Sequence, residues 1–264
     1  MDKIYIVVNP VSANKTTAKE WPGYEKALSD AGFEFEAVLT EYPGHAAELT
    51  RKAIKLGFKT IMSVGGDGTM NEVANGFFDN GRIIDEDSRL VVFSRGTGCD
   101  FVRTLGINKN IEDLLAILER NREKQIDVGR LSLACAEGNM PARYFLNVAD
   151  IGIGAETANR VNMNSKRFSG FLSFLLGTLS TVVLYKNKNF EVVIDDNIHL
   201  NGIMNSVIVA NGKYFGGGMM VAPDAVMDDG VFDIIILGNL SKQDIIKSFP
   251  LIFKGNHMNN PRRK

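Results

Sequence analysis

The sequence contains little cysteine and little histidine. Of its 264 residues, two are cysteine and three are histidine, and the formal net charge is -1. Cys99 and Cys135 have neither zinc-site nor disulfide spacing, which suits a reducing compartment. A net charge near zero gives no overall attraction to nucleic acid. The chain starts with a charged segment and a strand rather than a signal peptide, so we expect a cytoplasmic globular protein that does not bind nucleic acid.

Long apolar runs are also scarce, with one exception at residues 168–185. This stretch is flanked by lysine and arginine, but it contains three serines, two threonines and two glycines. A membrane-spanning helix needs about 20 predominantly apolar residues, so we do not expect this segment to cross a bilayer. Two alternatives stay open: a buried helix of the second half of the chain, which we predict below to be a separate domain, and a helix that lies on a membrane surface.

The composition otherwise allows a well-packed protein of one large domain or two ordinary ones, since 45% of the residues are hydrophobic. In the first half, strands are expected at residues 3–8, 33–40, 60–64 and 89–94, and helices at 17–31, 43–56, from 69, and at 111–119. This alternation predicts a parallel sheet with helices on both faces. Later strands are expected at 126–131, 143–153, 190–194, 202–210 and 230–237 with few helices between them. We therefore predict an α/β domain at residues 1–124 and a β-rich domain at 125–264.

The third expected strand ends in the loop Gly65-Gly66-Asp67-Gly68, which is followed by a helix. Glycines permit a sharp turn and let a ligand approach the backbone closely. The helix N-terminus behind them favours an anion such as phosphate. Asp67 beside a phosphate predicts a divalent cation between the two. We therefore predict a phosphate-binding loop, although Thr69 and Glu72 would equally fit a capping box of the helix.

Polar or glycine-rich breaks follow all four strands of the first half. They are Asn9 to Asn14, Thr40, Gly65 to Thr69, and Gly96 to Asp100. In parallel sheets, ligands bind beyond the carboxyl ends of the strands, so these breaks are expected to meet at one site. The last break would also fit a plain loop before a helix capped near Asp100.

Three other glycine motifs carry less information. Residues 152–154, Gly-Ile-Gly, lack the third glycine and the surrounding βαβ unit of a dinucleotide site. Residues 216–218 and 228–230 fit simple turns, and the acidic pair in the second of them would also fit a site for a hard cation. The residues alone leave that choice open.

Glycine loops, a metal-suited aspartate and hydroxyl side chains at strand ends together favour phosphoryl transfer from a nucleotide, which depends mainly on positioning and charge neutralisation. The sequence has neither a P-loop motif nor the protein-kinase motifs. In family order, it has Asn9-Pro10-Val11-Ser12, Gly65 to Thr69 with Asn71-Glu72, Gly96-Thr97 with Asp100-Phe101, Asp127-Val128-Gly129, and Asn211 through Asp229-Gly230. On these motifs, which span nearly the whole chain, it resembles the bacterial diacylglycerol kinase-type lipid kinases, a group that includes the sphingosine kinases.

The resemblance implies a fold, a site and partners. It implies a nucleotide-binding domain similar to those of phosphofructokinase and NAD kinase, followed by a β-sandwich, with ATP and Mg²⁺ as cofactors and Asp67 as the catalytic residue. It also implies a lipid acceptor met peripherally at the inner face of the membrane, and a homodimer. The implied metal ligands are the Asp229 carboxylate and the carbonyls of Val226 and Val231. The implied nucleotide site comprises Asn9, Pro10, Val11, Ser12, Ala13, Thr40, Gly65, Gly66, Asp67, Gly68, Thr69, Met70, Asn71, Glu72 and Thr97.

Two departures from the family pattern bear on activity. Cys99 stands where the family usually has asparagine. The family's chains also continue past the position of Lys264 into strands with an Asp-Gly-Glu motif that supplies the general base, and no Asp-Gly-Glu occurs here. We therefore assign no base, and three hypotheses stay open: a kinase for diacylglycerol or a related lipid, a soluble NAD kinase-like enzyme, and a nucleotide-binding protein with impaired catalysis.

Overall fold

The computed structural model describes residues 2–135, 138–164, 180–182 and 184–256. They form two compact units, Met1–Leu146 and Asn147–Lys264. Residues 125–146, which the sequence assigned to the second domain, belong to the first unit. There, β7 (Gly129–Leu131) pairs with β10 (Arg143–Phe145), and the Asn75 side chain exchanges two hydrogen bonds of 2.8 and 2.9 Å with the backbone of Tyr144.

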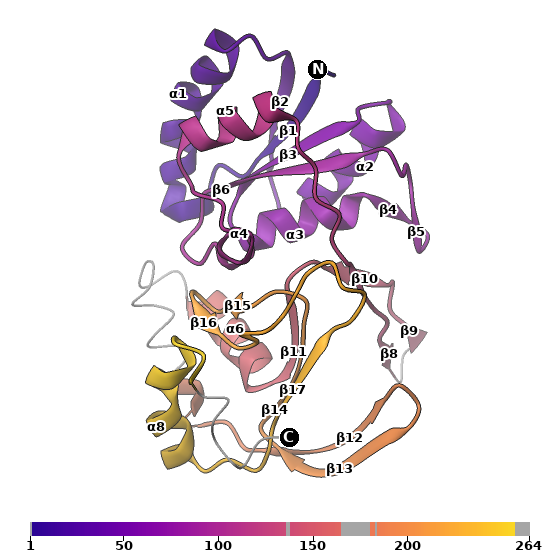
Figure 1. Ribbon diagram of the computed structural model, residues 1–264, viewed down its shortest axis with the longest axis vertical. Coiled ribbons are helices and arrows are strands. Elements are labelled where there is room, and N and C mark those ends of the chain that lie inside the picture. Colours follow the sequence, from indigo (N-terminus) through magenta and orange to yellow (C-terminus); the bar gives the residue numbers. More distant parts are fainter. Residues whose placement is uncertain (1, 136–137, 165–179, 183, 257–264) are drawn as a thin grey trace. The chain divides into compact units, whose positions relative to one another are not determined.

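The first unit is built on a parallel sheet of four strands in the order β2-β1-β3-β6 (Figure 1). The strands are β1 (Ile4–Val8), β2 (Phe35–Leu39), β3 (Thr60–Gly65) and β6 (Arg89–Ser94). Every residue of β1 and β3 is buried, as expected for central strands that are covered on both faces. Val8 pairs with both Leu39 and Val64, so the carboxyl ends of these strands lie level.

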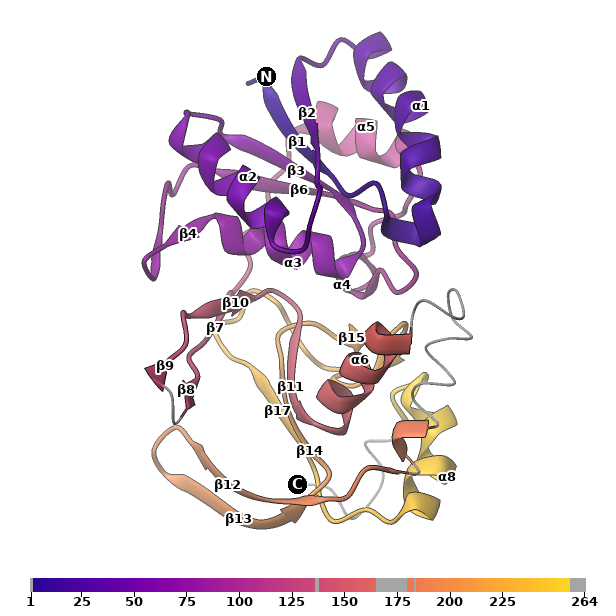
Figure 2. The same ribbon diagram turned by 180° about the vertical axis from the view of Figure 1, so that it is seen from behind.

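Helices cover both faces of this sheet, which confirms the predicted architecture (Figures 1 and 2). Alternate residues of β1 point to opposite faces, as the pleat of a strand requires. Ile4, Ile6 and Val8 join a core with Trp21 and Leu28 of α1 (Thr16–Asp30) and with Leu114 and Leu118 of α5 (Ile111–Arg120). Tyr5 and Val7 join a second core with Ala46, Ala53 and Ile54 of α2 (His45–Lys55) and with Val73 of α3 (Asp67–Gly76).

Short elements complete the first unit. A 3₁₀ turn, η1 (Ser12–Lys15), precedes α1, and α4 (Asp100–Leu105) follows the loop after β6. Two short hairpins are formed by β4 (Phe78–Asp79) with β5 (Arg82–Ile83) and by β8 (Ala134–Cys135) with β9 (Gly138–Asn139).

The second unit contains an antiparallel sheet, β11-β14-β17, and a long hairpin, β12-β13. Val207 and Ile236 of the sheet share a core with the hairpin, whereas Ile208 and Ile235 point to a separate core on the other face. The elements are β11 (Val148–Gly152), α6 (Ile153–Asn164), β12 (Lys188–Ile194), β13 (Ile198–Met204), β14 (Ser206–Ala210), β15 (Tyr214–Phe215), β16 (Met219–Met220), β17 (Asp233–Leu237) and α8 (Lys242–Ile252).

Three details of this unit differ from the sequence prediction. The expected strand 143–153 is divided into β10 and β11, because the carbonyl of Asn147 turns to accept N–H bonds from Asn211 and Gly212. The expected strand 202–210 is divided at Asn205, whose N–H bonds the Leu237 carbonyl at 2.7 Å. Helices α6 and α8 were not predicted, and α8 gave no clear signal because none of its residues is buried.

The apolar stretch 168–185 lies mostly outside the described residues, so the choice between a core helix and a surface helix stays a prediction. Within the described ranges, no helix combines the length and the hydropathy needed to cross a membrane.

Candidate functional site

Three of the four predicted loops are linked by hydrogen bonds at the carboxyl edge of the parallel sheet. After β1, the Asn9 N–H bonds the Val64 carbonyl of β3 at 2.9 Å, and the Asn9 side-chain amide donates to the Thr69 hydroxyl at 2.8 Å. After β6, the Arg95 N–H bonds the Gly65 carbonyl at 2.6 Å. These groups are distant in sequence and meet because parallel strands bring their carboxyl ends to one edge.

The loop after β1 has an unusual backbone. Ala13, Asn14 and Lys15 have successive φ angles of 50, 56 and 70°, the left-handed region that non-glycine residues seldom adopt. The Ser12 hydroxyl holds the turn, since it lies 2.9 Å from the Asn9 carbonyl and 2.7 Å from the Thr17 hydroxyl. The N-cap of α1, Lys15, makes no side-chain capping bond. The Thr16 N–H, which begins α1, instead bonds the Ala13 carbonyl of this loop.

The glycine loop differs from the sequence prediction in where its helix begins. α3 starts at Asp67, with extended Gly66 as N-cap, rather than at about Thr69. Thr69 therefore lies in the first turn, is buried, and accepts from Asn9, so the capping box of Thr69 and Glu72 is wrong. Only glycine fits at position 65, because a Cβ there would lie 2.5 Å from the Thr69 hydroxyl oxygen.

Asp67 connects the glycine loop to the loop after β6. Its two carboxylate oxygens accept the backbone N–H groups of Asp100 and Phe101, each at 3.2 Å. These N–H groups belong to the first turn of α4. Cys99 is the N-cap residue by position but makes no side-chain capping bond, so the Asp67 carboxylate caps the helix instead. Each carboxylate oxygen has a second lone-pair direction, so capping does not prevent Asp67 from also facing a cation.

The two glycine loops approach each other so closely that a side chain would not fit at Gly96. A Cβ on Gly96 would lie 2.6 Å from the Cα of Gly66. Next to this contact, Cys99 is buried with a φ of 54°, and its thiol donates to the Gly96 carbonyl at 3.0 Å. A thiol thus provides one local hydrogen bond at the position where the resemblance expected asparagine.

Arg95 has a structural role at this edge that the sequence analysis did not identify. Its guanidinium forms an ion pair with Glu20 and lies 5.2 Å from the Tyr24 ring, both on α1. The Tyr24 hydroxyl also donates to Glu20, at 2.9 Å. Arg95 is therefore directed at α1 and ties the loop after β6 to it.

The remaining predicted residues differ in accessibility. Gly68, Thr97 and Val11 are exposed, whereas Met70 is buried and contributes to packing. Partly exposed positions are Asn9, Pro10, Ser12, Ala13, Thr40, Gly66, Asp67, Asn71 and Glu72. Thr40 follows β2, and its N–H bonds the Val8 carbonyl at 2.8 Å, which places the fourth loop at the same edge.

In the second unit, the predicted metal loop has oxygen-rich chemistry. The Asp229 carboxylate accepts the Val231 N–H at 3.2 Å. Burial raises the pKa of Asp233, and the carboxylates of Asp229 and Asp224 raise it further, so negative charge is concentrated here. Within the described residues, no cluster of three metal-binding side chains exists, so a cation would depend on carbonyls such as those of Val226 and Val231. Carboxylate and carbonyl oxygens are the donors that Mg²⁺ prefers, so the donor chemistry fits.

Asp150 is a buried carboxyl group in this unit that the sequence did not reveal. It accepts a short hydrogen bond from the Ser206 hydroxyl. Burial raises the pKa of Asp150 to about 6, although this bond and the Gly154 N–H favour the charged form. A Cβ on Gly154 would lie 1.9 Å from the carboxylate, so the Gly-Ile-Gly motif makes room for Asp150.

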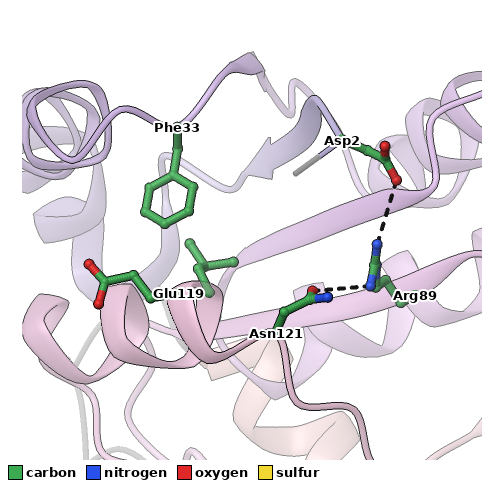
Figure 3. Close-up of a pocket in the computed structure, with 6 residues that line it drawn as sticks. Asp2, Phe33, Arg89, Glu119 and Asn121 are labelled. Carbon is green, nitrogen blue, oxygen red and sulfur yellow. Dashed lines mark hydrogen bonds and ion pairs between the residues drawn. The ribbon is translucent and has the colours of Figure 1, made fainter.

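A cavity of about 410 Å³ opens at the other end of the parallel sheet (Figure 3). Arg89 lines it at the start of β6, where it contacts Asp2 at 3.6 Å and the Asn121 side chain at 3.2 Å. Arg89 also forms an ion pair with Glu123. Because its charge is already paired and the four loops lie at the opposite edge, we do not assign the candidate site to this cavity.

Both units match known protein domains. Residues 3–131 match the diacylglycerol kinase catalytic domain, and residues 147–264 match the YegS C-terminal NAD kinase beta sandwich-like domain. The chain belongs to the diacylglycerol kinase family. It is therefore a lipid kinase, and the expected order of an α/β domain followed by a β-sandwich-like domain is confirmed.

Individual relatives agree with this assignment. A diacylglycerol kinase of Bacillus subtilis is 27% identical over 263 residues, which cover 98% of this lipid kinase and 82% of the relative. An Alcanivorax borkumensis protein named "Probable lipid kinase YegS-like" is 29% identical over 213 residues, or 78% of this chain and 64% of that protein. A crystal structure of a diacylglycerol kinase from Bacillus anthracis matches this chain with a TM-score of 0.66 at 24% identity. The match covers 94% of this chain and 78% of that one, and it shows the same fold.

Proposed function

We propose that this lipid kinase transfers the γ-phosphoryl group of ATP to the hydroxyl of diacylglycerol or a related lipid, giving phosphatidic acid or its analogue. The hydroxyl oxygen forms a bond to the γ-phosphorus and loses its proton to solvent, the bond from that phosphorus to the bridging oxygen breaks, and ADP leaves. The observation that carries the proposal is the hydrogen-bonded meeting of the loops after β1, β3 and β6 in a unit that matches a diacylglycerol kinase catalytic domain.

The loops supply what a nucleotide's phosphates need. Gly66 and Gly96 keep side chains away from the backbone, so a phosphate can approach main-chain N–H groups. The N-termini of α1 and α3 lie at the same edge, where their dipoles favour negative charge. We assign the nucleotide-binding site to residues 9–13, Thr40, residues 65–72 and Thr97. All of these residues lie within the nucleotide-binding domain, residues 1–124, that the sequence predicts.

Asp67 is the residue that we expect to control catalysis. As the cap of α4, it fixes the loop of Gly96 and Thr97 relative to the glycine loop. Its carboxylate is also the group that would face a nucleotide-bound Mg²⁺, which neutralises phosphate charge when bound. A second Mg²⁺ would be held by Asp229 with the carbonyls of Val226 and Val231, and it would serve structure rather than phosphoryl transfer.

The acceptor is expected to reach the enzyme from a membrane. A diacylglycerol is confined to a bilayer, so the kinase would meet this acceptor as a peripheral protein at the cytoplasmic face. Assembly as a homodimer also belongs to the proposal.

The experiment is transfer of labelled phosphate from ATP, with Mg²⁺, to diacylglycerol, sphingosine, phosphatidylglycerol and NAD in mixed micelles. We expect one lipid to be phosphorylated and the activity to disappear in Asp67→Ala. Phosphorylation of NAD alone would instead support a soluble NAD kinase-like enzyme. ATP binding without transfer to any acceptor would contradict the proposal and support impaired catalysis.

A further inference from the structure

Arg95 directly precedes Gly96 in the loop after β6, to which we assign part of the nucleotide-binding site. An arginine beside a phosphate site commonly binds the phosphates itself. Here the side chain is only 20% exposed, and its contacts lie elsewhere. The guanidinium forms an ion pair with Glu20 and lies 5.2 Å from the Tyr24 ring and 5.8 Å from the Phe93 ring. These contacts hold the charged group against α1 and the sheet rather than in the loop.

The backbone and the side chain of Arg95 bind different parts of the first unit. The backbone N–H bonds the Gly65 carbonyl in the glycine loop after β3, at 2.6 Å. The ion pair reaches Glu20 in the second turn of α1. Nη1 also donates to the Lys109 carbonyl, at 3.3 Å, in the segment between α4 and α5. Arg95 therefore joins the glycine loop, α1 and this segment at a single residue.

Helix α1 is in turn attached to the loop after β1. The Ser12 hydroxyl of that loop lies 2.7 Å from the Thr17 hydroxyl in the first turn of α1. Glu20 follows Thr17 by three residues, which is about one helical turn. The ion pair of Glu20 with Arg95 thus links the loop after β1 to the loop after β6, on the side of the sheet that α1 covers.

The loop after β6 has little space in which to adjust. A Cβ on Gly96 would lie 2.6 Å from the Gly66 Cα, so the two glycine loops are already in close contact. Arg95 and Gly96 share a planar peptide unit, so a displacement of Arg95 also moves Gly96 and the exposed Thr97 behind it. The position of the Arg95 side chain therefore bears on the shape of the nucleotide-binding site.

We propose that Arg95 is a positioning residue for ATP. Its ion pair with Glu20 holds Gly96 and Thr97 in the arrangement that receives the nucleotide, and its guanidinium does not bind the phosphates. The inference rests on the proposed function for the identity of the nucleotide. It also fixes the sign of the effect of Glu20, because a carboxylate that only repelled a polyanion would weaken ATP binding, whereas this one strengthens it.

The test combines a binding titration of ATP with Mg²⁺ and the kinetics of labelled phosphate transfer at varied ATP. The variants are Arg95→Ala, Arg95→Lys and Glu20→Ala. The matched controls are Arg89→Ala and Glu123→Ala, which remove an ion pair at the opposite end of the same strand, β6. Denaturant unfolding shows which variants are folded. If Arg95→Ala does not fold, Glu20→Ala breaks the same ion pair from a partly exposed helix position and decides the question.

We expect Arg95→Ala and Glu20→Ala each to weaken ATP binding and to raise the KM for ATP about tenfold, the order of effect of a residue that acts on a site without touching the ligand. The kcat should stay within about twofold of the parent's, because ATP at saturation restores the bound arrangement. Arg95→Lys should recover part of the loss, since lysine keeps the charge but not the planar fork. Both controls should bind ATP as the parent does.

Three results would overturn the positioning role: unchanged ATP affinity in the folded Arg95→Ala variant, an equal loss of affinity in the controls, or tighter ATP binding in Glu20→Ala. The last result would mean that Arg95, once released, binds the phosphates directly. If the parent binds ATP but phosphorylates no acceptor, the proposed function fails. The titration then still decides the inference, because weaker binding in both Arg95→Ala and Glu20→Ala supports the positioning role without any transfer.

Discussion

Replacing Asp67 tests whether one carboxylate both holds the loops together and takes part in phosphoryl transfer. Asp67→Ala removes the acceptors of two N–H bonds, those of Asp100 and Phe101, each at 3.2 Å. Asp67→Asn keeps one carbonyl oxygen and therefore one of these bonds, but it removes the negative charge. The two variants thus separate the capping role from the role of the charge.

The expected effects differ in size. Loss of a helix cap costs about 0.5–2 kcal/mol, and a partly buried N–H left unpaired adds to it, so Asp67→Ala should lower the unfolding free energy of the first unit by about 2 kcal/mol. Asp67→Asn should cost about 1 kcal/mol or less for the same reason. Both should reduce phosphoryl transfer at least about a hundredfold, the usual effect of removing a group that stabilises developing charge.

Stability is measured by denaturant unfolding, and activity by labelled phosphate transfer in mixed micelles. The matched control is Asn110→Ala, because the Asn110 side chain caps α5 by accepting the Asp113 N–H at 2.7 Å, away from the loops. It should lose similar stability and keep its activity. Near-normal turnover in Asp67→Asn would show that Asp67 is only a cap, and unchanged stability in Asp67→Ala would refute the capping argument.

Three further predictions concern single positions. Gly96→Ala should lower both stability, by about 1–3 kcal/mol, and ATP affinity in a binding titration, because its Cβ would lie 2.6 Å from the Gly66 Cα; normal ATP binding would contradict the close approach of the loops. Asp150 binds its proton more tightly when folded, with a pKa of about 6 against 3.8, so stability should fall as pH rises through this window, by about 3 kcal/mol in all. Asp150→Asn should remove that slope in unfolding measured across the window, and an unchanged slope would assign it to another group. Asp229→Ala should abolish any rise of the melting temperature with Mg²⁺, whereas an equal rise in parent and variant would place the cation elsewhere.

The fold of the first unit could be predicted because its signals are local. The apolar run in β1 is long enough for a strand, and its position before a polar turn and a helix indicates a parallel unit. Helix starts were less certain. α3 begins at Asp67 rather than at Thr69, and Asn9, 60 residues away, binds the Thr69 hydroxyl, for which a capping box was an open alternative.

The second unit was harder to predict because its breaks depend on tertiary hydrogen bonds. Asn147 and Asn205 interrupt what looks like continuous strand, and both do so by bonding residues far along the chain. Helix α8 was missed because it is short and none of its residues is buried, so no core-facing stripe marks it.

The sequence by itself determined the parallel sheet and the glycine loops at its carboxyl edge, because strand length, glycine content and motif order act within a few residues. Only the tertiary structure decided how the loops are held together. Asp67 caps α4 across 33 residues, and Ser206 reaches Asp150 across 56. No local pattern encodes such pairs, since they arise when strands distant in sequence bring their ends to one edge of a sheet.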